Sequence, residues 1–416
     1  MSNWKSRLFT MSAACALLLA ACNTDEAKEE VKEQQTAAEE AHAHEEESHE
    51  TTEGTRLLVS YADGFIVMNS AFEEIERYNI GPSSLALGSD MRHVFVKDSA
   101  NNDSYTLLDI GVWNEDHADH LHPYAEVPVL AIYEMEANKA AHVVSHNNQT
   151  AVFHDGSGLV EVFDAKNLST EGTPIPVYTY QGKAHHGVAV PLSDGTLAVS
   201  YQTEEGANLP GGVKIVDSHG HDVATITDAC NGLHGTVYSG SGATEKLAFG
   251  CNGNVIAYDV ATKETTSIAL PNEEARVSTI KHHTDSTYYL TNYKEGENPT
   301  TKLGVINSET NEFTLVELPA AYGSGVLVAA DNIGYVQAEN GILYKIDLAK
   351  AQIVEEIDAL QAFNLEEEKI SLALVNNEVL IVVPNANAIL QVHGDHVHQV
   401  ADLDVEPTGV LSVTAY

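Results

Sequence analysis

Histidine is the residue type with the clearest chemical potential in this chain of 416 residues, because its 20 histidines nearly equal the 21 lysines and arginines together. Three of them, His142, His186 and His234, are 44 and 48 residues apart, and each begins a short apolar segment. Neutral imidazole nitrogen is a preferred ligand of Zn²⁺, which usually binds four donors tetrahedrally. The spacing predicts three equivalent positions in a repeated structure, where the imidazoles would form a zinc site. The alternative is that they bond only to water or backbone.

A second cluster packs three histidines and three carboxylates into the eight residues from Glu115 to His122. Its histidines are His117, His120 and His122. We expect this segment to be a loop between the third and fourth strands of its repeat, on the face opposite the starts of the first strands. Whether it joins the first three histidines in one site or forms a second site stays open.

Three further histidines, His42, His44 and His49, lie in an acidic tract near the N-terminus. Such tracts bind metal weakly or serve as solvated spacers. Arg276 falls at the level of the histidines in the next repeat, where it would repel a cation and displace the site toward the three histidines. We expect most of the remaining histidines to be surface residues, namely His185, His219, His221, His282 and His283.

The elements that must position these residues are short strands. From Arg56 onward, runs rich in Val, Ile, Leu, Tyr and Thr alternate with turn pairs such as Asp-Gly and Asn-Gly. The runs group in fours, with a repeat of roughly 35 to 55 residues, which is typical of propeller blades. We therefore predict an all-β protein, a β-propeller of four-stranded blades, with eight blades and seven as the alternative. Residues 56–80 and 409–416 would share a blade, so that the two chain ends close the ring. A β-sandwich array is the competing fold.

The N-terminus indicates export. Lys5 and Arg7 precede an apolar stretch, too short to span a membrane, which ends in Leu19-Ala20-Ala21-Cys22. This motif predicts a lipoprotein signal peptide over residues 1–21 and lipidation at Cys22; an ordinary secretory signal is the alternative. Residues 22–54 would be an acidic tether, and residues 55–416 the propeller domain. The protein would be extracytoplasmic and held to the cell membrane through the lipid alone, in a periplasm or on the outer face.

Export also bears on the remaining cysteines and on the charge. Cys230 and Cys251 would lie in an oxidising compartment, at the ends of a hairpin, and we expect them to form a disulfide. The net charge of −40 makes nucleic acid an improbable partner and attracts cations without selecting among them.

Several of these motifs together resemble the AztD-type zinc metallochaperones. They are Asp116 to His120, His185 to Pro191, and Cys230 to Gly235 with Phe249 to Cys251. The resemblance implies an extracytoplasmic propeller that passes zinc to the solute-binding protein of a zinc ABC transporter. It makes His117, His120, His142, His186 and His234 zinc-site candidates and His42, His44 and His49 a mobile transfer tract. His122 is an additional ligand option, and the lipid anchor departs from the family pattern.

Two other functions compete with zinc delivery. Three histidines with an open fourth position could make a hydrolytic zinc, as in a lactonase-like propeller hydrolase. A non-catalytic interaction scaffold would leave the histidine surplus unexplained. Neither a Ser nucleophile elbow nor a Cys-x-x-Cys-His sequence is present, so we expect no catalytic residues. Because imidazole sites bind copper more tightly than zinc, the sequence leaves the true metal open.

Overall fold

The computed structural model describes residues 54–100, 103–117, 120–297 and 300–415. The predicted signal peptide, Cys22, His42, His44, His49 and nearly all of the predicted tether lie outside these ranges. Within them, no helix has the length and apolar character needed to cross a membrane.

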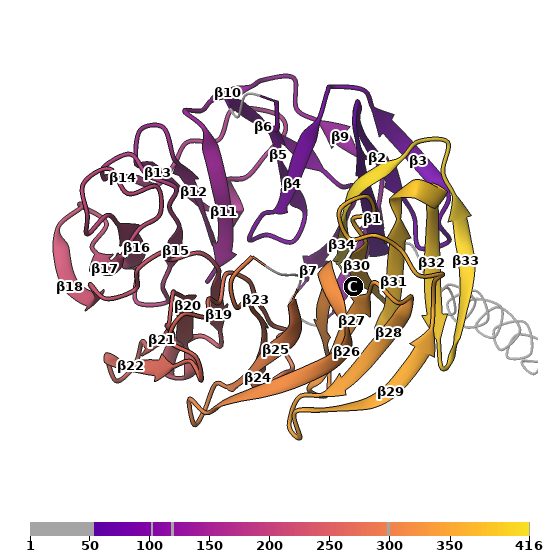
Figure 1. The fold of residues 1–416 in the computed structure, drawn as a ribbon. Helices are drawn as coiled ribbons and strands as arrows, with labels where there is room; N and C mark the ends of the chain where they lie inside the picture. Colours follow the sequence, from indigo (N-terminus) through magenta and orange to yellow (C-terminus); the bar gives the residue numbers. More distant parts are fainter. Residues whose placement is uncertain (1–53, 101–102, 118–119, 298–299, 416) are drawn as a thin grey trace, which may run out of the picture. The chain divides into compact units, whose positions relative to one another are not determined.

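The described chain is all-β, as predicted, and its helical content is three short 3₁₀ turns: η2 (Ala165–Asn167), η3 (Gly242–Thr244) and η4 (Pro384–Ala386). The strands form antiparallel sheets, most of them four-stranded, which follow one another in chain order (Figure 1). This arrangement is consistent with the predicted propeller.

The first two sheets hold the N-terminal strands, and the first also takes in the last strand of the chain. Its order is β3-β2-β1-β34, from β1 (Thr55–Tyr61), β2 (Gly64–Met68), β3 (Glu74–Tyr78) and β34 (Pro407–Thr414). The second has the order β10-β6-β5-β4, with β9 also paired to β6, from β4 (Ser83–Leu87), β5 (His93–Asp98), β6 (Ser104–Asp109), β9 (Val129–Leu130) and β10 (Met135–Glu136).

Three four-stranded meanders follow, each with its strands paired in chain order. The first contains β11 (Ala140–His146), β12 (Gln149–His154), β13 (Leu159–Asp164) and β14 (Tyr178–Gln181). The second contains β15 (Ala189–Pro191), β16 (Leu197–Tyr201), β17 (Gly212–Val216) and β18 (Asp222–Thr227). The third contains β19 (Thr236–Ser239), β20 (Lys246–Gly250), β21 (Asn254–Asp259) and β22 (Glu264–Ala269).

A seven-stranded sheet and a final meander complete the series. The seven strands are β23 (Ile280–Lys281), β24 (Tyr288–Tyr293), β25 (Thr300–Asn307), β26 (Phe313–Ala329), β27 (Ile333–Ala338), β28 (Ile342–Asp347) and β29 (Gln352–Asp358). The N-terminal part of β26 pairs with β25 and its C-terminal part with β27. The final meander contains β30 (Ser371–Val375), β31 (Glu378–Val383), β32 (Ala388–His393) and β33 (His396–Asp402).

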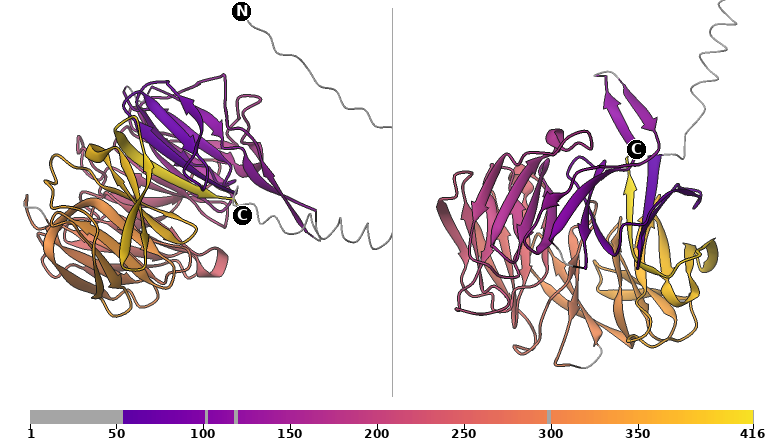
Figure 2. Two further views of the ribbon diagram at one scale, coloured as in Figure 1. Left: turned by 90° about the vertical axis from the view of Figure 1, so that its right-hand side faces the viewer. Right: turned by 90° about the horizontal axis from the view of Figure 1, so that it is seen from above.

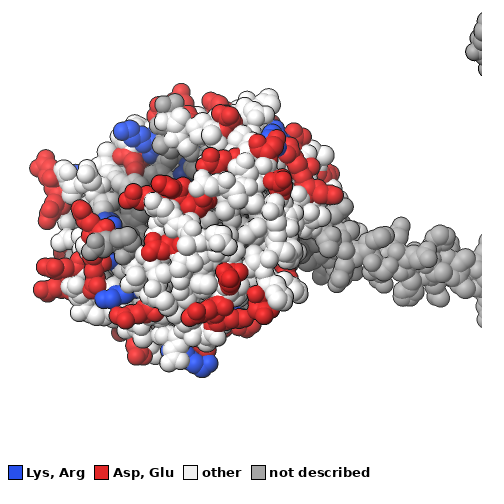
Figure 3. Space-filling model, turned by 45° about the vertical axis from the view of Figure 1, so that its right-hand side comes forward, with Lys and Arg blue, Asp and Glu red and all other residues white. Residues whose placement is uncertain are grey.

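Apolar side chains are buried between neighbouring sheets. The strands β1 and β2 are buried along their whole length, whereas the outer strand β29 alternates between exposed residues and half-buried or buried ones. One core cluster joins Val67 of the first sheet to Val94 of the second, and another joins Val190 to Phe249. Inner strands are covered on both faces, so their sequences are continuous apolar runs. In the outer strands, apolar residues alternate with polar ones. Acidic side chains are spread over the face that Figure 3 shows, and basic ones are few.

The predicted disulfide between Cys230 and Cys251 is present, with their Cα atoms 5.0 Å apart. The hairpin register does not place the two cysteines opposite each other, since Thr236 pairs with Phe249 in the β19–β20 ladder. Instead the loop before β19 folds back, and the Asn252 backbone N–H donates to the Asn231 carbonyl. The pairing was predicted correctly, but the loop rather than the ladder brings the sulfurs together.

Candidate metal centre

The three equivalent histidines lie together in the structure. His142 belongs to β11, while His186 and His234 lie in the loops that precede β15 and β19. Their ring centroids are 4.8 Å (His142–His186), 5.5 Å (His186–His234) and 6.4 Å (His142–His234) apart. Rings bound through one nitrogen to a tetrahedral zinc would have centroids about 5 Å apart. The three imidazoles are therefore near the separation that a shared ion requires.

Each of the three rings uses its Nδ1 atom in a bond to an acceptor. His142 Nδ1 is 2.8 Å from the Gly187 carbonyl oxygen, and His234 Nδ1 is 2.8 Å from the Ser278 carbonyl oxygen. His186 Nδ1 is 2.6 Å from Asp155 Oδ2. Carbonyl and carboxylate oxygens only accept, so Nδ1 must carry the proton in all three rings. That tautomer leaves each Nε2 lone pair available to a metal, and it is the outer-shell arrangement that metal-binding histidines use.

Asp155 and Gly187 connect two of the rings. The second oxygen of Asp155, Oδ1, accepts from the Gly187 backbone N–H at 3.2 Å, and the Gly187 carbonyl in turn accepts from His142. A Cβ atom on Gly187 would lie 2.3 Å from the Phe153 ring and 2.6 Å from His185 Nε2. Only glycine fits here, so the loop can place His186 and, in the next residue, the carbonyl that orients His142.

The environments of His142 and His186 move their pKa values in opposite directions. Burial, together with the nearby His186, lowers the pKa of His142 to about 4. The hydrogen bond to Asp155 raises the pKa of His186 above its ordinary value. His142 is thus neutral over the whole physiological range, and His186 is the ring that more readily takes up a proton.

The rings line a cavity of about 320 Å³ whose other walls are mainly apolar, including Val144, Val188 and Leu233. Arg276 does not line it: Ser278, Thr279 and Ile280 occupy that side, and the Arg276 guanidinium donates to the Gly232 carbonyl. Arg276 therefore does not take the place beside the three histidines that the repeat spacing predicted for it. In the described part of the chain, no group of three or more His, Cys, Asp or Glu is arranged so that it could hold a metal ion as it stands.

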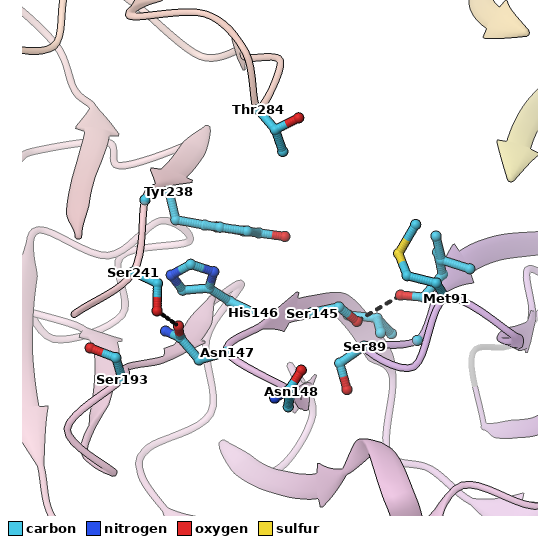
Figure 4. A pocket seen from close by; sticks show the side chains of 14 residues that line it. Ser89, Met91, Ser145, His146, Asn147, Asn148, Ser193, Tyr238, Ser241 and Thr284 are labelled. Atoms are coloured by element: carbon cyan, nitrogen blue, oxygen red, sulfur yellow. Dashed lines mark hydrogen bonds between the residues drawn. The ribbon is translucent and has the colours of Figure 1, made fainter. Parts of the chain in front are cut away.

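A larger cavity of about 840 Å³ shares Val143 and Tyr238 with this site. Figure 4 shows the Tyr238 ring over His146, with centroids 4.5 Å apart, and Asn147 beside them. Behind His146 lies the fully buried Glu245, whose carboxylate is 2.9 Å from His146 Nε2 and accepts from the Asn147 side chain at 2.6 Å. Glu245 also accepts from the Ser193 N–H of the sheet between them, so these contacts join turns of three successive sheets and account for His146 as a structural residue.

The second predicted cluster lies on a hairpin rather than a loop. The strands β7 (Val112–Asp116) and β8 (Leu121–Ala125) pair with each other alone. Trp113 stacks on Tyr124 at 4.9 Å, and the Arg92 guanidinium lies 3.5 Å from the Trp113 ring. Trp113 precedes the three histidines in the chain and Tyr124 follows them, so their stacking holds the two ends of the segment together as paired strands. The sequence pattern had predicted a loop for these residues. The hairpin stands out from the neighbouring sheets (Figure 2).

His117, His120 and His122 gather at this hairpin, with ring centroids 4.6 to 5.6 Å apart. The Nε2 atoms of His120 and His122 are 2.8 Å apart, against about 3.3 Å for two ligands of one tetrahedral zinc. None of the hairpin's described residues lines the His142 cavity. The structure thus brings the six predicted histidines together as two groups of three.

His185 is buried, contrary to the expectation of a surface position. Its Nδ1 donates to the Lys183 carbonyl at 2.8 Å, and its Nε2 accepts from the Ser200 hydroxyl at 3.0 Å. Both nitrogens are used, so His185 supports the loop and leaves no lone pair for a metal. The sequence did not reveal the groups that accept hydrogen bonds from the three Nδ1 atoms. The main one is Asp155, which in the sequence is indistinguishable from the first residue of an ordinary Asp-Gly turn.

Comparison with known proteins points the same way as the motifs. No protein-family model matches the chain. The zinc chaperone AztD of Citrobacter koseri is 23% identical over 361 residues, which cover 82% of this chain and 81% of AztD. The chain resembles AztD.

The structural likeness to AztD extends over most of both proteins. The crystal structure of Citrobacter koseri AztD matches with a TM-score of 0.74 and 22% identity, over 86% of this chain and 97% of AztD, and the structure of apo AztD gives 0.73. The dihydro-heme d1 dehydrogenase NirN in complex with DHE matches at 0.55 and 12% identity, over 86% of this chain and 75% of that one. At these identities the likeness establishes a common fold. The resemblance to AztD inferred from the motifs is confirmed.

Proposed function

We propose that the protein is an extracytoplasmic zinc metallochaperone and that His142, His186 and His234 bind its cargo. The observation that carries this proposal is the shared hydrogen-bonding pattern of the three rings. Each Nδ1 proton is bound by an oxygen acceptor, so each Nε2 is left for a metal. The sequence likeness to a zinc chaperone supports zinc as that metal. Three protein ligands leave a fourth position for an incoming or outgoing donor.

An eight-bladed propeller is the architecture we propose around this site. When β26 is counted in both halves of the seven-stranded sheet, the described strands fall into eight groups of four, apart from β9 and the β7–β8 hairpin. The first strands of neighbouring groups contact each other, as in β4 with β11 and β11 with β15. The pairing of β1 with β34 would close the ring. The three histidines would then face the central channel from three consecutive blades.

Zinc would leave this site for the solute-binding protein of a zinc ABC transporter. His42, His44 and His49 would form the weak transfer site on a tether lipidated at Cys22, and residues 1–21 would be the signal peptide. A flexible tract loses about 1–2 kcal/mol per ordered backbone residue when it folds around a metal. It would therefore hold zinc more weakly than the folded site and exchange it faster. The His117, His120 and His122 hairpin would provide a second, exposed metal position.

Separate variants distinguish storage from delivery. Replacing His142, His186 and His234 by Ala should abolish tight zinc binding, as measured by chelator competition. Deleting residues 24–50 should leave tight binding nearly intact but slow zinc transfer to a purified solute-binding protein. Loss of tight zinc on tether deletion would make the tract the storage site, and metal content unaffected by either change would refute the zinc proposal. Elemental analysis of the protein from its native envelope identifies the cargo.

A further inference from the structure

A third group of histidines lies on the outer hairpin of the last sheet, far along the chain from both clusters described above. His393 ends β32 and His396 begins β33, and they are directly paired, as are Gln391 and His398. Directly paired residues of antiparallel strands project from the same face, and so do residues two apart on one strand. His393, His396 and His398 therefore share one face of this hairpin.

Glu378 of the neighbouring strand β31 extends this group. Its Oε1 atom is 3.2 Å from His393 Nδ1, and its Oε2 atom accepts from the Gln391 side chain. The carboxylate can only accept when ionised, so the His393 proton lies on Nδ1 and the Nε2 atom keeps its lone pair. This is the carboxylate–imidazole arrangement that also holds His186 ready for a metal.

The distances across the hairpin suit a chelate. Directly opposite residues have Cβ atoms about 4.5–5.5 Å apart, and diagonal neighbours about 7–8 Å. An imidazole reaches a zinc through Nε2 at about 2.0–2.1 Å, so two or three such rings can meet one ion above the sheet. The side chains of His393 and His396 are 77% and 84% exposed, so their rings can turn toward a common ion without disturbing the core. His396 Nε2 lies 3.3 Å from Asp395 Oδ1, so this ring must leave that carboxylate when it binds the ion.

We infer that His393, His396 and His398 form a surface site for a divalent transition metal, with Glu378 orienting His393. Imidazole donors suit Zn²⁺, Cu²⁺ and Ni²⁺ and disfavour Mg²⁺ and Ca²⁺. The site is independent of the proposed zinc cavity, because none of its residues lines that cavity. A bound ion ties β33, which is the edge strand of its sheet, to β32 beside the turn.

Hydrogen exchange of the full chain, with and without Zn²⁺, tests this site at its own position. The ion should slow exchange several-fold at the backbone amides of residues 391–398, because opening the hairpin then requires breaking metal bonds. The double variant H393Q/H396Q should lose this protection. The matched control is H219Q/H221Q, which removes two exposed histidines from another turn, one of them bonded to Asp217; it should keep the protection.

A further arm separates this site from the proposed function. The variant with His142, His186 and His234 replaced by Ala should still show Zn²⁺-dependent protection of the β32–β33 hairpin. Protection that is absent from the native chain, or that persists in H393Q/H396Q, would overturn the inference. Equal exchange of all variants without metal verifies that the substitutions leave the hairpin folded.

Discussion

Asp155→Asn is the sharpest perturbation of the candidate metal centre, because it exchanges one carboxylate oxygen for an NH₂ group and changes almost no volume. In the native chain, Asp155 accepts from two donors, His186 Nδ1–H at 2.6 Å and the Gly187 N–H at 3.2 Å. An asparagine has a single acceptor oxygen and must present its own N–H group to one of these donors. If that group faces His186, the ring must take the tautomer with its proton on Nε2, the atom that zinc needs.

The expected loss follows from the structure. Outer-shell acceptors of metal-binding histidines typically contribute 10- to 100-fold in affinity, or about 1.4–2.7 kcal/mol. We expect the upper part of this range here, because Asp155 also fixes Gly187, whose carbonyl orients His142. Two of the three rings would thus lose part of their alignment. The free energy of unfolding without metal should change less, since Asp155 is partly exposed.

Zinc affinity measured by chelator competition at pH 7.5 tests this expectation. The control is Glu161→Gln, which alters the carboxylate bonded to His154 at 2.9 Å, on the same sheet but outside the cavity; its zinc affinity should match that of the native chain. An Asp155→Asn affinity within twofold of native would refute the role of Nδ1 acceptors in preparing this site.

Three further predictions rest on other contacts. On acidification, zinc affinity should begin to fall already above pH 6.5, because the raised pKa of His186 lets a proton compete for its Nε2 atom. His142, with a pKa of about 4, stays neutral over this range. A zinc affinity that is flat from pH 8 to 5.5 would exclude these imidazoles as ligands. The denatured, unreduced chain should show no free thiol from Cys230 or Cys251, and reduction should lower the free energy of unfolding in urea by about 3 kcal/mol for a separation of 21 residues. Glu245→Ala should cost about 3 kcal/mol in the same assay, because the Asn147 side chain and the Ser193 N–H lose the charged acceptor that they share; a loss below 1 kcal/mol would contradict this.

Much of the fold could be predicted because its strands are short, recur regularly and are separated by recognisable turn residues. Alternating runs and turn pairs marked most strands, and an Asp closes β13, β21 and β28. The 17-residue β26 was not predictable as one strand, since Gly323-Ser324-Gly325 near its centre has the composition of a turn, whereas in the structure two groups merge through it. The β7–β8 hairpin was missed because its cause is stacking between Trp113 and Tyr124, which sequence alternation does not reveal.

Of the candidate site, the three histidines could be predicted from the sequence, but the groups that orient them could not. Repeat spacing was sufficient to select His142, His186 and His234, because equivalent positions in a repeat face the same way. Their acceptors depend on how one sheet packs on the next, and backbone carbonyls such as that of Ser278 have no sequence signature. The group at His393, His396 and His398 was overlooked although its residues are nearly adjacent, because only the register shows that they share a face.

The pairing of β1 with β34 has a mechanical consequence. Thr55 lies opposite Thr414, and the Ala415 N–H donates to the Gly54 carbonyl at 2.9 Å, so the two ends of the described chain leave the sheet side by side. A force that pulls these two ends apart acts on the β1–β34 hydrogen bonds one at a time, starting from the Thr55–Thr414 pair. Forced unfolding should therefore begin in this sheet. The same adjacency means that a linker of a few residues could join the ends, so that a circular permutant with new termini in an exposed turn should keep every strand pairing.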